Sequence, residues 1–255
     1  MKNIPLLRAL YIFLKYTFKP YFSFRPFQFI KGIFWFFGDY RTFKKINTNR
    51  NFKFKLTDIE ACLSDCTETT PLDPVYFFQD TWAARKIFDL KPSKHVDVGS
   101  SAKTIGIISQ FVPTTMIDIR PLELSVDGLS YLKGSILDLP FNSDSLETLS
   151  SICVIEHIGL GRYGDPIDSD GSEKAIIELR RVVMPGGHLI LSVPVEAQST
   201  IHFNANRSFT RNHFLSLFPD FELIEERYQY KKEFCEIFIP ERGFGTGMFL
   251  LKKIM

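Results

Sequence analysis

A short β-branched run that stops in a glycine limits the folds open to this chain more than any other segment. The run His95-Val96-Asp97-Val98 is followed directly by Gly99, Ser100 and Ser101. Valine favours strands, and glycine permits the tight turn by which a strand enters a helix with its backbone exposed. The segment therefore predicts a strand, a turn that is able to bind a ligand, and a helix.

An acid follows this turn at an informative distance. Asp118 lies nineteen residues after Gly99, within the apolar run Met116-Ile117-Asp118-Ile119. In nucleotide-binding α/β folds, an acid about 20 residues after the glycine turn lies at the tip of the neighbouring strand, where its carboxylate accepts hydrogen bonds from ribose hydroxyls. An ordinary crossover without a ligand can have the same spacing, so the pair alone leaves both interpretations open.

The alternation of strands and helices continues to the end of the chain. Further strands are predicted over 129–136, 146–155, 188–193, 221–230 and 247–254, and helices over 76–90, 172–183 and 209–218. Strands that alternate with helices favour a parallel sheet covered on both faces, and the last strand is expected to return antiparallel. We therefore predict an α/β fold: a doubly wound, mostly parallel, seven-stranded sheet with an N-terminal helical arm.

The charge is distributed unevenly, although the net charge is only +2. Residues 1–50 contain ten basic residues and one acid, Asp39, for a charge of +9, whereas the remainder carries −7. Fifteen aromatic residues lie among these cations within the first 45 positions. A basic aromatic arm on an acidic body suggests that the arm meets something anionic.

The arm leaves several interpretations open. Arg8, Lys15 and Lys19 share one face of a predicted helix, which suits attachment to an anionic membrane surface. The aromatics would equally suit a lid packed on the catalytic domain or on a second subunit. Nucleic acid is not expected, because no nucleic-acid motif accompanies the charge. Cations interrupt every apolar stretch, so neither a membrane span nor a secretory signal is expected. We predict a cytoplasmic protein, either free or peripheral at the inner membrane face.

Composition divides the chain into three parts. Residues 1–55 form the basic aromatic arm, residues 56–75 a connector, and residues 76–255 the main domain. The four cysteines show neither a paired metal pattern nor a dense disulfide framework, which suits a reducing compartment. The sequence does not indicate an oligomeric state.

Five short motifs follow one another along the chain: Asp97-Val98-Gly99, Asp118, Asp138-Leu139-Pro140-Phe141, residues 154–158 and residues 179–187. In order and at the right intervals, they resemble those of the class I S-adenosylmethionine-dependent methyltransferases over roughly residues 75–255. A narrower likeness, carried by residues 156–166 (EHIGLGRYGDP), is to an uncharacterised group of that superfamily, some of whose members lie in surface-polysaccharide gene sets.

The resemblance implies a set of cofactor-binding residues for S-adenosylmethionine. Asp118 would accept from both ribose hydroxyls, Asp138 from the adenine amine, and the Leu139 backbone would donate to the adenine ring. Backbone NH groups after the turn suit the cofactor's carboxylate. The expected set is Asp97, Gly99, Ser100, Ser101, Lys103, Asp118, Asp138, Leu139 and Cys153, with Cys153 near the sulfonium.

One departure from the family pattern affects this site. The family's first motif repeats glycine at alternate positions, whereas this chain has Ser101 and Lys103 there. Side chains at these places narrow the cofactor's approach to the backbone. Lys103 is able to compensate as a point charge on the carboxylate, or it marks a weakened or lost site.

The acceptor side is predicted from polar residues after the fourth strand. His157 is the first candidate base, because imidazole titrates near neutrality, and Asp165 is the second. A histidine hydrogen-bonded beneath the loop is an equal alternative for His157. The predicted substrate-binding residues are Arg162, Tyr163, Asn204, Asn206 and Arg207. No metal is expected, because the acids at 165, 168 and 170 fail the calcium-loop template.

Together these features predict methyl transfer by direct displacement to a hydroxyl of a glycan or glycolipid precursor. The displacement requires an in-line nucleophile close to the methyl carbon, so positioning does most of the work. Two alternatives remain: methylation of a small lipophilic acceptor such as a quinone or phenol, and a binding module that keeps the fold without catalysis.

Overall fold

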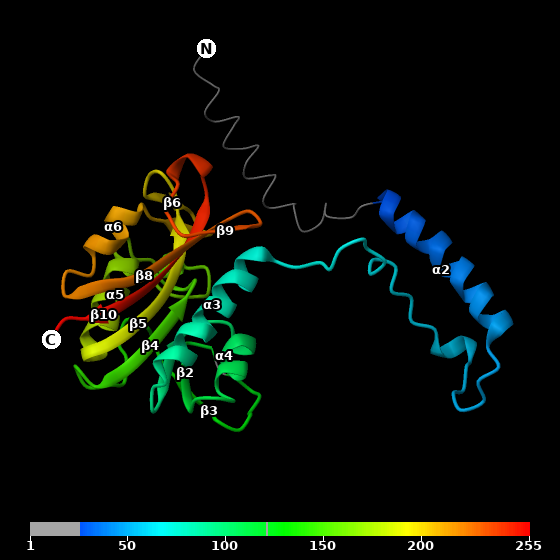
Figure 1. Cartoon of the computed structure of the whole chain (residues 1–255), viewed down its shortest axis with the longest axis horizontal. Helices are drawn as coiled ribbons and strands as arrows, with labels where there is room; N and C mark the ends of the chain where they lie inside the picture. Colours follow the sequence, from blue (N-terminus) through cyan, green and yellow to red (C-terminus); the bar gives the residue numbers. More distant parts are fainter. Residues whose placement is uncertain (1–25, 121) are drawn as a thin grey trace, which may run out of the picture. The chain divides into compact units, whose positions relative to one another are not determined.

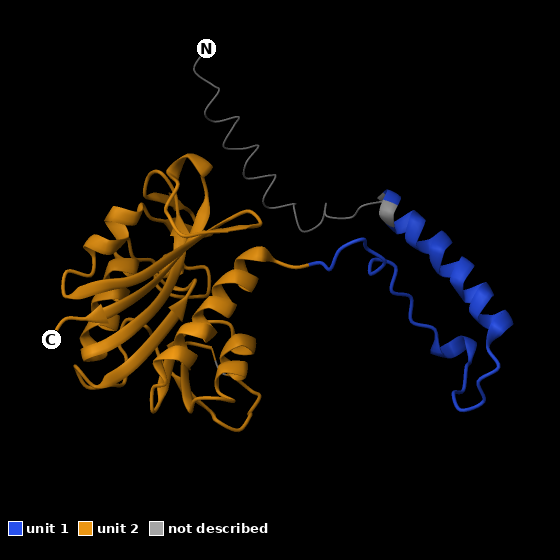
Figure 2. Ribbon diagram, viewed as in Figure 1, with its two compact units in different colours: residues 1–71 blue, residues 72–255 orange. Residues whose placement is uncertain are grey.

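The computed structural model describes residues 26–120 and 122–255, which form two units (Figure 2). Unit 1 is Met1–Pro71 and unit 2 is Leu72–Met255. The division falls inside the predicted connector, residues 56–75. The predicted helix that contains Arg8, Lys15 and Lys19 lies outside the described residues.

Unit 2 is built on an eight-stranded sheet. Its strand order is β3-β2-β1-β4-β5-β10-β8-β9, with the first five strands parallel and β10 antiparallel to both of its neighbours. The strands are β1 (His95–Val98), β2 (Thr114–Asp118), β3 (Leu129–Lys133), β4 (Leu146–Ile152), β5 (Val183–Val195), β8 (Phe221–Tyr230), β9 (Glu233–Cys235) and β10 (Gly245–Lys253).

The prediction of seven strands was short by one. After Tyr230 the chain turns at Lys231, which has a positive φ of 56°, and β9 pairs antiparallel with the end of β8. Because β9 has only three residues, no alternating pattern identifies it in the sequence. A separate two-stranded hairpin is formed by β6 (Thr200–His202) and β7 (Asn206–Ser208).

Helices cover both faces of the sheet (Figure 1). They are α3 (Pro74–Leu90), α4 (Ala102–Ile108), α5 (Gly171–Val182) and α6 (Arg211–Ser216), with single 3₁₀ turns η2 (Ile155–His157) and η3 (Pro240–Arg242). Alternate residues of each strand point to opposite faces. Leu189 and Leu191 of β5 therefore pack in the core with α5 and α6, whereas Ile190 packs in a second core with α3 and α4. This arrangement confirms the doubly wound fold.

Unit 1 consists of a long helix and an extended segment that packs on it. Helix α2 (Pro26–Ile46) precedes a 3₁₀ turn, η1 (Leu56–Asp58). The ring of Phe54 lies 5.9 Å from that of Tyr40 and 5.3 Å from that of Phe43. A Cβ at Gly32 would collide with the carbonyl oxygen of Leu63, so the glycine lets this segment approach closely. Within the described ranges, no helix is long and apolar enough to cross a membrane.

Candidate functional site

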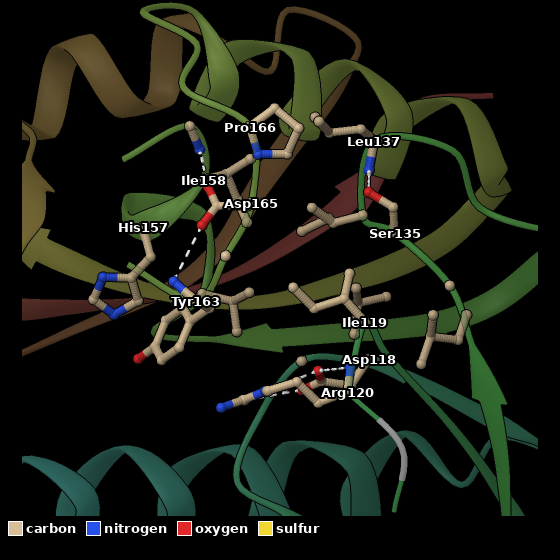
Figure 3. A pocket seen from close by; sticks show the side chains of 18 of the residues that line it. Asp118, Ile119, Arg120, Ser135, Leu137, His157, Ile158, Tyr163, Asp165 and Pro166 are labelled. Atoms are coloured by element: carbon tan, nitrogen blue, oxygen red, sulfur yellow. Dashed lines mark hydrogen bonds and ion pairs between the residues drawn. The ribbon is translucent and has the colours of Figure 1, made fainter. Parts of the chain in front are cut away.

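A cavity of about 450 Å³ opens where strands β1, β2 and β4 end (Figure 3). Ligands of open α/β sheets bind outside the carboxyl ends of the strands, which is where this cavity lies. Its walls are formed by Val98, Gly99, Ile117, Asp118, Ile119, Arg120, Gly134, Ser135, Ile136, Leu137, Cys153, Val154, His157, Ile158, Gly159, Tyr163, Gly164, Asp165 and Pro166.

The turn after β1 requires glycine at its first position. Gly99 has a φ of 74°, and its backbone NH donates to the Ile117 carbonyl at 2.8 Å. A Cβ at Gly99 would lie 2.9 Å from Cγ1 of Val154, closer than real side chains approach. Glycine therefore allows the ends of β1, β2 and β4 to meet around one cavity.

Asp97 lies beneath this turn and not in the cavity wall. Its buried carboxylate accepts from the Ser100 backbone NH at 3.1 Å, from the Ser100 hydroxyl at 2.6 Å and from the Ser150 hydroxyl at 2.5 Å. Burial raises the pKa of Asp97 to about 6, although these hydrogen bonds lower it. Asp97 and Ser100, both predicted to contact the cofactor, therefore shape the turn from below.

Asp118 lies in the cavity wall at the end of β2, as its spacing predicted. Its carboxylate accepts from the Arg120 backbone NH at 2.8 Å, from Nε at 3.3 Å and from Nη2 at 3.2 Å. The hydrogen bond to Asp118 raises the pKa of Arg120. The same guanidinium lies 4.8 Å from the ring centroid of Tyr163. Sequence reasoning missed Arg120, although its position two residues after the acid was a signal.

The structure does not bring Asp138 and Leu139 to the cavity. Asp138 is exposed, and the backbone NH of Leu139 donates to Oε1 of Glu178 on α5 at 2.7 Å. Glu178 is held by Arg181, whose hydrogen bond lowers the pKa of that carboxyl. In their place, Ser135 and apolar side chains such as Ile119 and Leu137 line the cavity beside Asp118. None of these was predicted from the motifs.

Of the remaining predicted cofactor residues, two lie outside the cavity wall and one lies in it. Ser101 precedes α4 and Lys103 is exposed on its first turn, and neither lines the cavity. Cys153 does line it, with a positive φ of 53°. Its thiol donates to Oε1 of Gln79 on α3 at 2.9 Å, and burial raises the pKa of this thiol.

His157 lies at the cavity edge, and both of its ring nitrogens face protein groups. Nδ1 is 2.6 Å from the Ala205 carbonyl oxygen, and Nε2 is 3.7 Å from Oε1 of Glu156. A carbonyl only accepts, so Nδ1 carries the proton and Nε2 is the basic nitrogen. Burial and, to a smaller extent, nearby Arg162 lower the pKa of His157 to about 4. Figure 3 shows the imidazole pointing away from Ser135 and Leu137.

Glu156 is a buried acid that sequence reasoning did not select. It is 1% exposed, and its Oε2 has no hydrogen-bond partner among the described residues. Burial raises the pKa of Glu156 to about 8, so the carboxyl is largely neutral at pH 7. A polar residue inside the apolar run 152–158 was the available signal.

Asp165 organises the loop between η2 and α5. Its Oδ2 accepts from the backbone NH of Gly159 at 2.7 Å and of Gly161 at 3.4 Å, and its Oδ1 accepts from that of Tyr163 at 3.3 Å. This carboxylate is committed to the backbone of its own loop, which does not suit the role of second base. No cluster of three His, Cys, Asp or Glu side chains suited to a metal ion occurs among the described residues.

The β6–β7 hairpin reaches the same region through a backbone carbonyl. Nη1 of Arg162 donates to the Ala205 oxygen at 2.9 Å, the oxygen that also binds His157. Asn204 is exposed at the hairpin turn, and the Asn206 amide donates to the carbonyl of Arg207 at 3.2 Å. Two predicted substrate segments, far apart in sequence, therefore meet, although Asn204 and Asn206 do not line the cavity.

Arg207 lies beneath the loop and is 6% exposed. One terminal nitrogen donates to the Ile158 carbonyl and the Ser172 hydroxyl, and the other donates to the carbonyls of Asp168 and Ser169, both at 3.0 Å. A guanidinium whose two terminal nitrogens both bind the protein in this way holds the loop in place. The structure therefore gives Arg207 a positioning role and not the predicted contact with substrate.

Solved structures with similar folds include a [4+2]-cyclase, SpnF (TM-score 0.53, 12% identity, 69% of this chain and 81% of that chain). A putative sarcosine dimethylglycine methyltransferase from Galdieria sulphuraria matches with TM-score 0.53 and 16% identity, over 72% of this chain and 92% of that chain. The Burkholderia thailandensis 1,6-didemethyltoxoflavin-N1-methyltransferase, solved with S-adenosylhomocysteine, matches with TM-score 0.51 and 12% identity, over 74% of this chain and 94% of that chain.

This chain therefore has the Rossmann-like fold of the class I methyltransferases. A family model described as a Caenorhabditis protein of unknown function, DUF268, matches residues 137–238. The matched segment includes the loop after η2 and the β6–β7 hairpin, and it leaves out Gly99 and Asp118. No curated protein matches the sequence. Because a cyclase shares the fold with methyltransferases, the reaction has to be argued from the site.

Proposed function

We propose that this protein transfers a methyl group from S-adenosylmethionine to an acceptor. The supporting observation is one cavity whose wall contains the Gly99 turn, Asp118 and Cys153 at the carboxyl ends of three parallel strands. Its volume of about 450 Å³ lies within the range of cofactor sites. The bound cofactor supplies an electrophilic methyl group on a sulfonium.

The residues present fit this cofactor. Asp118 is an acceptor-only carboxylate and suits two ribose hydroxyls. Apolar side chains such as Ile119 and Leu137 suit the faces of an adenine ring, and both line the cavity. Gly99 gives close access to the backbone, and Cys153 lies at the end of β4, towards the acceptor side.

For the acceptor, the proposal is a hydroxyl group of a glycan or glycolipid precursor. His157, Tyr163 and Arg162 form a polar group beside the cavity, which suits a hydroxylated acceptor better than an apolar one. The Ala205 carbonyl fixes the His157 tautomer, so Nε2 is the nitrogen that would accept the hydroxyl proton. His157 lines the cavity, and its Nε2 would have to turn from Glu156 towards the acceptor.

Calorimetric titration with S-adenosylmethionine and S-adenosylhomocysteine tests the cofactor site. Asp118→Asn should weaken binding of either compound by roughly ten- to hundredfold, because hydrogen bonds to a charged group contribute about 1.5–3 kcal/mol. Asp127→Asn is the matched control, since Asp127 is exposed and does not line the cavity. If neither compound binds the unmodified protein at millimolar concentration, the non-catalytic binding module replaces the enzyme as the explanation.

For unit 1 we propose contact with an anionic membrane surface. Phe27, Ile30, Phe34 and Phe37 are exposed on α2 at spacings of three and four, which places them on one face. Arg41, Lys44 and Lys45 extend this face into the last turns of the helix. Exposed aromatics beside cations are the composition of an interfacial helix, and each cation near an anionic surface contributes about 1 kcal/mol.

Flotation with anionic liposomes tests this contact. Lys44→Glu combined with Lys45→Glu should reduce the fraction of protein that floats with phosphatidylserine vesicles, because it reverses two charges on the proposed face. Lys231→Glu with Lys232→Glu makes the same charge change on exposed residues of unit 2. This control should leave the floating fraction unchanged. Equal flotation of both variants and the parent would remove the membrane from the proposal.

A further inference from the structure

Two guanidinium groups lie against one aromatic ring beside the cavity. The guanidinium carbon of Arg120 is 4.8 Å, and that of Arg162 5.2 Å, from the ring centroid of Tyr163. Tyr163 and Arg120 both line the cavity, and Figure 3 shows Arg120 extending alongside the Tyr163 ring. Arg120 follows β2 and Arg162 lies on the loop after η2, so the ring joins the cofactor side of the cavity to the acceptor side.

The charges of the two arginines are used differently. Arg162 donates to a neutral carbonyl, that of Ala205, and takes part in none of the ion pairs among the described residues. Arg120 is paired with Asp118, and its side chain is nevertheless 60% exposed. Its Nη1 has no hydrogen-bond partner among the described residues. Two cations therefore share the Tyr163 ring at the cavity wall, and only Arg120 is paired with a carboxylate.

Occupation of the proposed cofactor site changes this pairing. A carboxylate has about four acceptor positions. Three of the positions on Asp118 are already taken by Arg120, two of them by its side chain at 3.2 and 3.3 Å. Two ribose hydroxyls would compete with these long side-chain contacts. One acceptor position on Asp118 is open, so two hydroxyls would displace at least one of the two side-chain donors of Arg120.

We propose that Arg120 and Arg162 form a binding site for a phosphate or diphosphate group of the acceptor, and that ribose binding at Asp118 completes it. Arginine binds phosphate oxygens through paired, charge-assisted hydrogen bonds. Nη1 of Arg120 is available in the free protein, whereas Nε and Nη2 are shared with Asp118 until that carboxylate has another partner. The inference rests on the proposed function. It makes binding ordered: the cofactor enters first, and the phosphorylated acceptor follows.

The test is calorimetry with inorganic pyrophosphate, with and without saturating S-adenosylhomocysteine. S-adenosylhomocysteine is used because its ammonium and carboxylate charges cancel, so it adds no net charge to the site. Pyrophosphate should bind at least about fivefold more tightly to the complex than to the free protein, which is the lower end of typical coupling between sites. By reciprocity, pyrophosphate should tighten binding of S-adenosylhomocysteine by the same factor.

Variants separate this site from the cofactor site. Arg120→Gln should bind S-adenosylhomocysteine as tightly as the parent or more tightly, and should bind pyrophosphate weakly with no effect of the first ligand. Arg162→Gln should weaken pyrophosphate binding to the complex. Arg85→Gln is the matched control, because Arg85 also forms an exposed ion pair with a nearby acid, at 3.1 Å from Asp89, and it should behave as the parent.

Each outcome is decisive for one of the two proposals. Failure of S-adenosylhomocysteine to bind the parent ends the proposed function. Normal binding without coupling to pyrophosphate, or loss of S-adenosylhomocysteine binding in Arg120→Gln, overturns the phosphate site alone. Uridine diphosphate and farnesyl diphosphate then distinguish the source of the group: tighter binding of the former indicates a nucleotide-linked acceptor, and of the latter a lipid-linked one.

Discussion

The two halves of the cavity are built by different means. The sheet half, residues 95–101, 114–120 and 149–157, takes its shape from buried polar contacts such as those of Asp97 with Ser100 and Ser150. The loop half, residues 158–172 with the hairpin turn at 203–206, is held by backbone-directed contacts from Asp165 and Arg207. Its residues 162–164 and 166–167 are exposed, whereas Gly159 and Leu160 are buried.

The acids of the two halves differ in the same way. Burial raises the pKa of Asp97 and Glu156 in the sheet half. In the loop half, a hydrogen bond from Lys174 lowers the pKa of Asp168. Solvent screens the exposed pair and does not reach the buried acids. Under the proposed function, the cofactor would meet the half that buried polar contacts shape, and the acceptor would meet the half that contacts to the loop backbone hold.

The largest expected effect comes from Glu156. Its pKa is about 8 in the folded protein and 4.5 without burial. Between these values the folded state binds more protons than the unfolded state, so the free energy of unfolding falls as pH rises. Glu156→Gln removes this term, and its stability relative to the parent should rise by about 4 kcal/mol between pH 5 and pH 8, at about 1.4 kcal/mol for each pH unit.

Urea denaturation of both proteins from pH 5 to pH 9 measures this difference. Comparison with the variant is needed because His95 and His157, whose pKa values burial lowers, act in the opposite direction below about pH 6.5. Parallel stability curves for parent and variant would show that Glu156 is solvated in solution, and the contrast between the halves would lose its main support.

A second test of the sheet half is Gly99→Ala. The substitution places a side chain at a φ of 74° and 2.9 Å from Val154, and strain plus overpacking should cost roughly 2–4 kcal/mol. Binding of S-adenosylhomocysteine should also be lost, because the strand ends are pushed apart. Gly186→Ala is the matched control: it has a φ of 80° and nothing within 4 Å of the added carbon, so it isolates the strain from the collision.

The sheet half was readable from sequence because its signals are local. Gly99 and Asp118 are fixed by spacing along the chain, and the alternation of strands with helices predicted a sheet covered on both faces. The same motif comparison misplaced Asp138 and Leu139, because Leu139 finds Glu178 on α5, a partner 39 positions away that no local pattern announces. Local patterns also did not reveal β9.

The loop half was only partly readable for the same physical reason. The glycines and polar residues of 159–165 indicated a functional loop, but side chains of one composition can face a ligand or the loop's own backbone. Arg207 was predicted to contact substrate and instead binds the loop from below. Arg120 was missed because its importance arises from Tyr163, 43 positions further along the chain.

Arg207→Lys gives the smallest of the three effects and tests the loop half alone. Lysine keeps the charge but loses the planar fork that reaches four oxygens, which should cost about 2 kcal/mol. Amides of residues 158–172 should exchange faster with deuterium, while binding of S-adenosylhomocysteine stays unchanged. Arg180→Lys, which loses contacts to Asp220 and Leu217 away from the cavity, should destabilise without altering exchange in this loop. If Arg207→Lys instead weakens cofactor binding, the two halves form one cooperative unit, and the division into a cofactor half and an acceptor half is wrong.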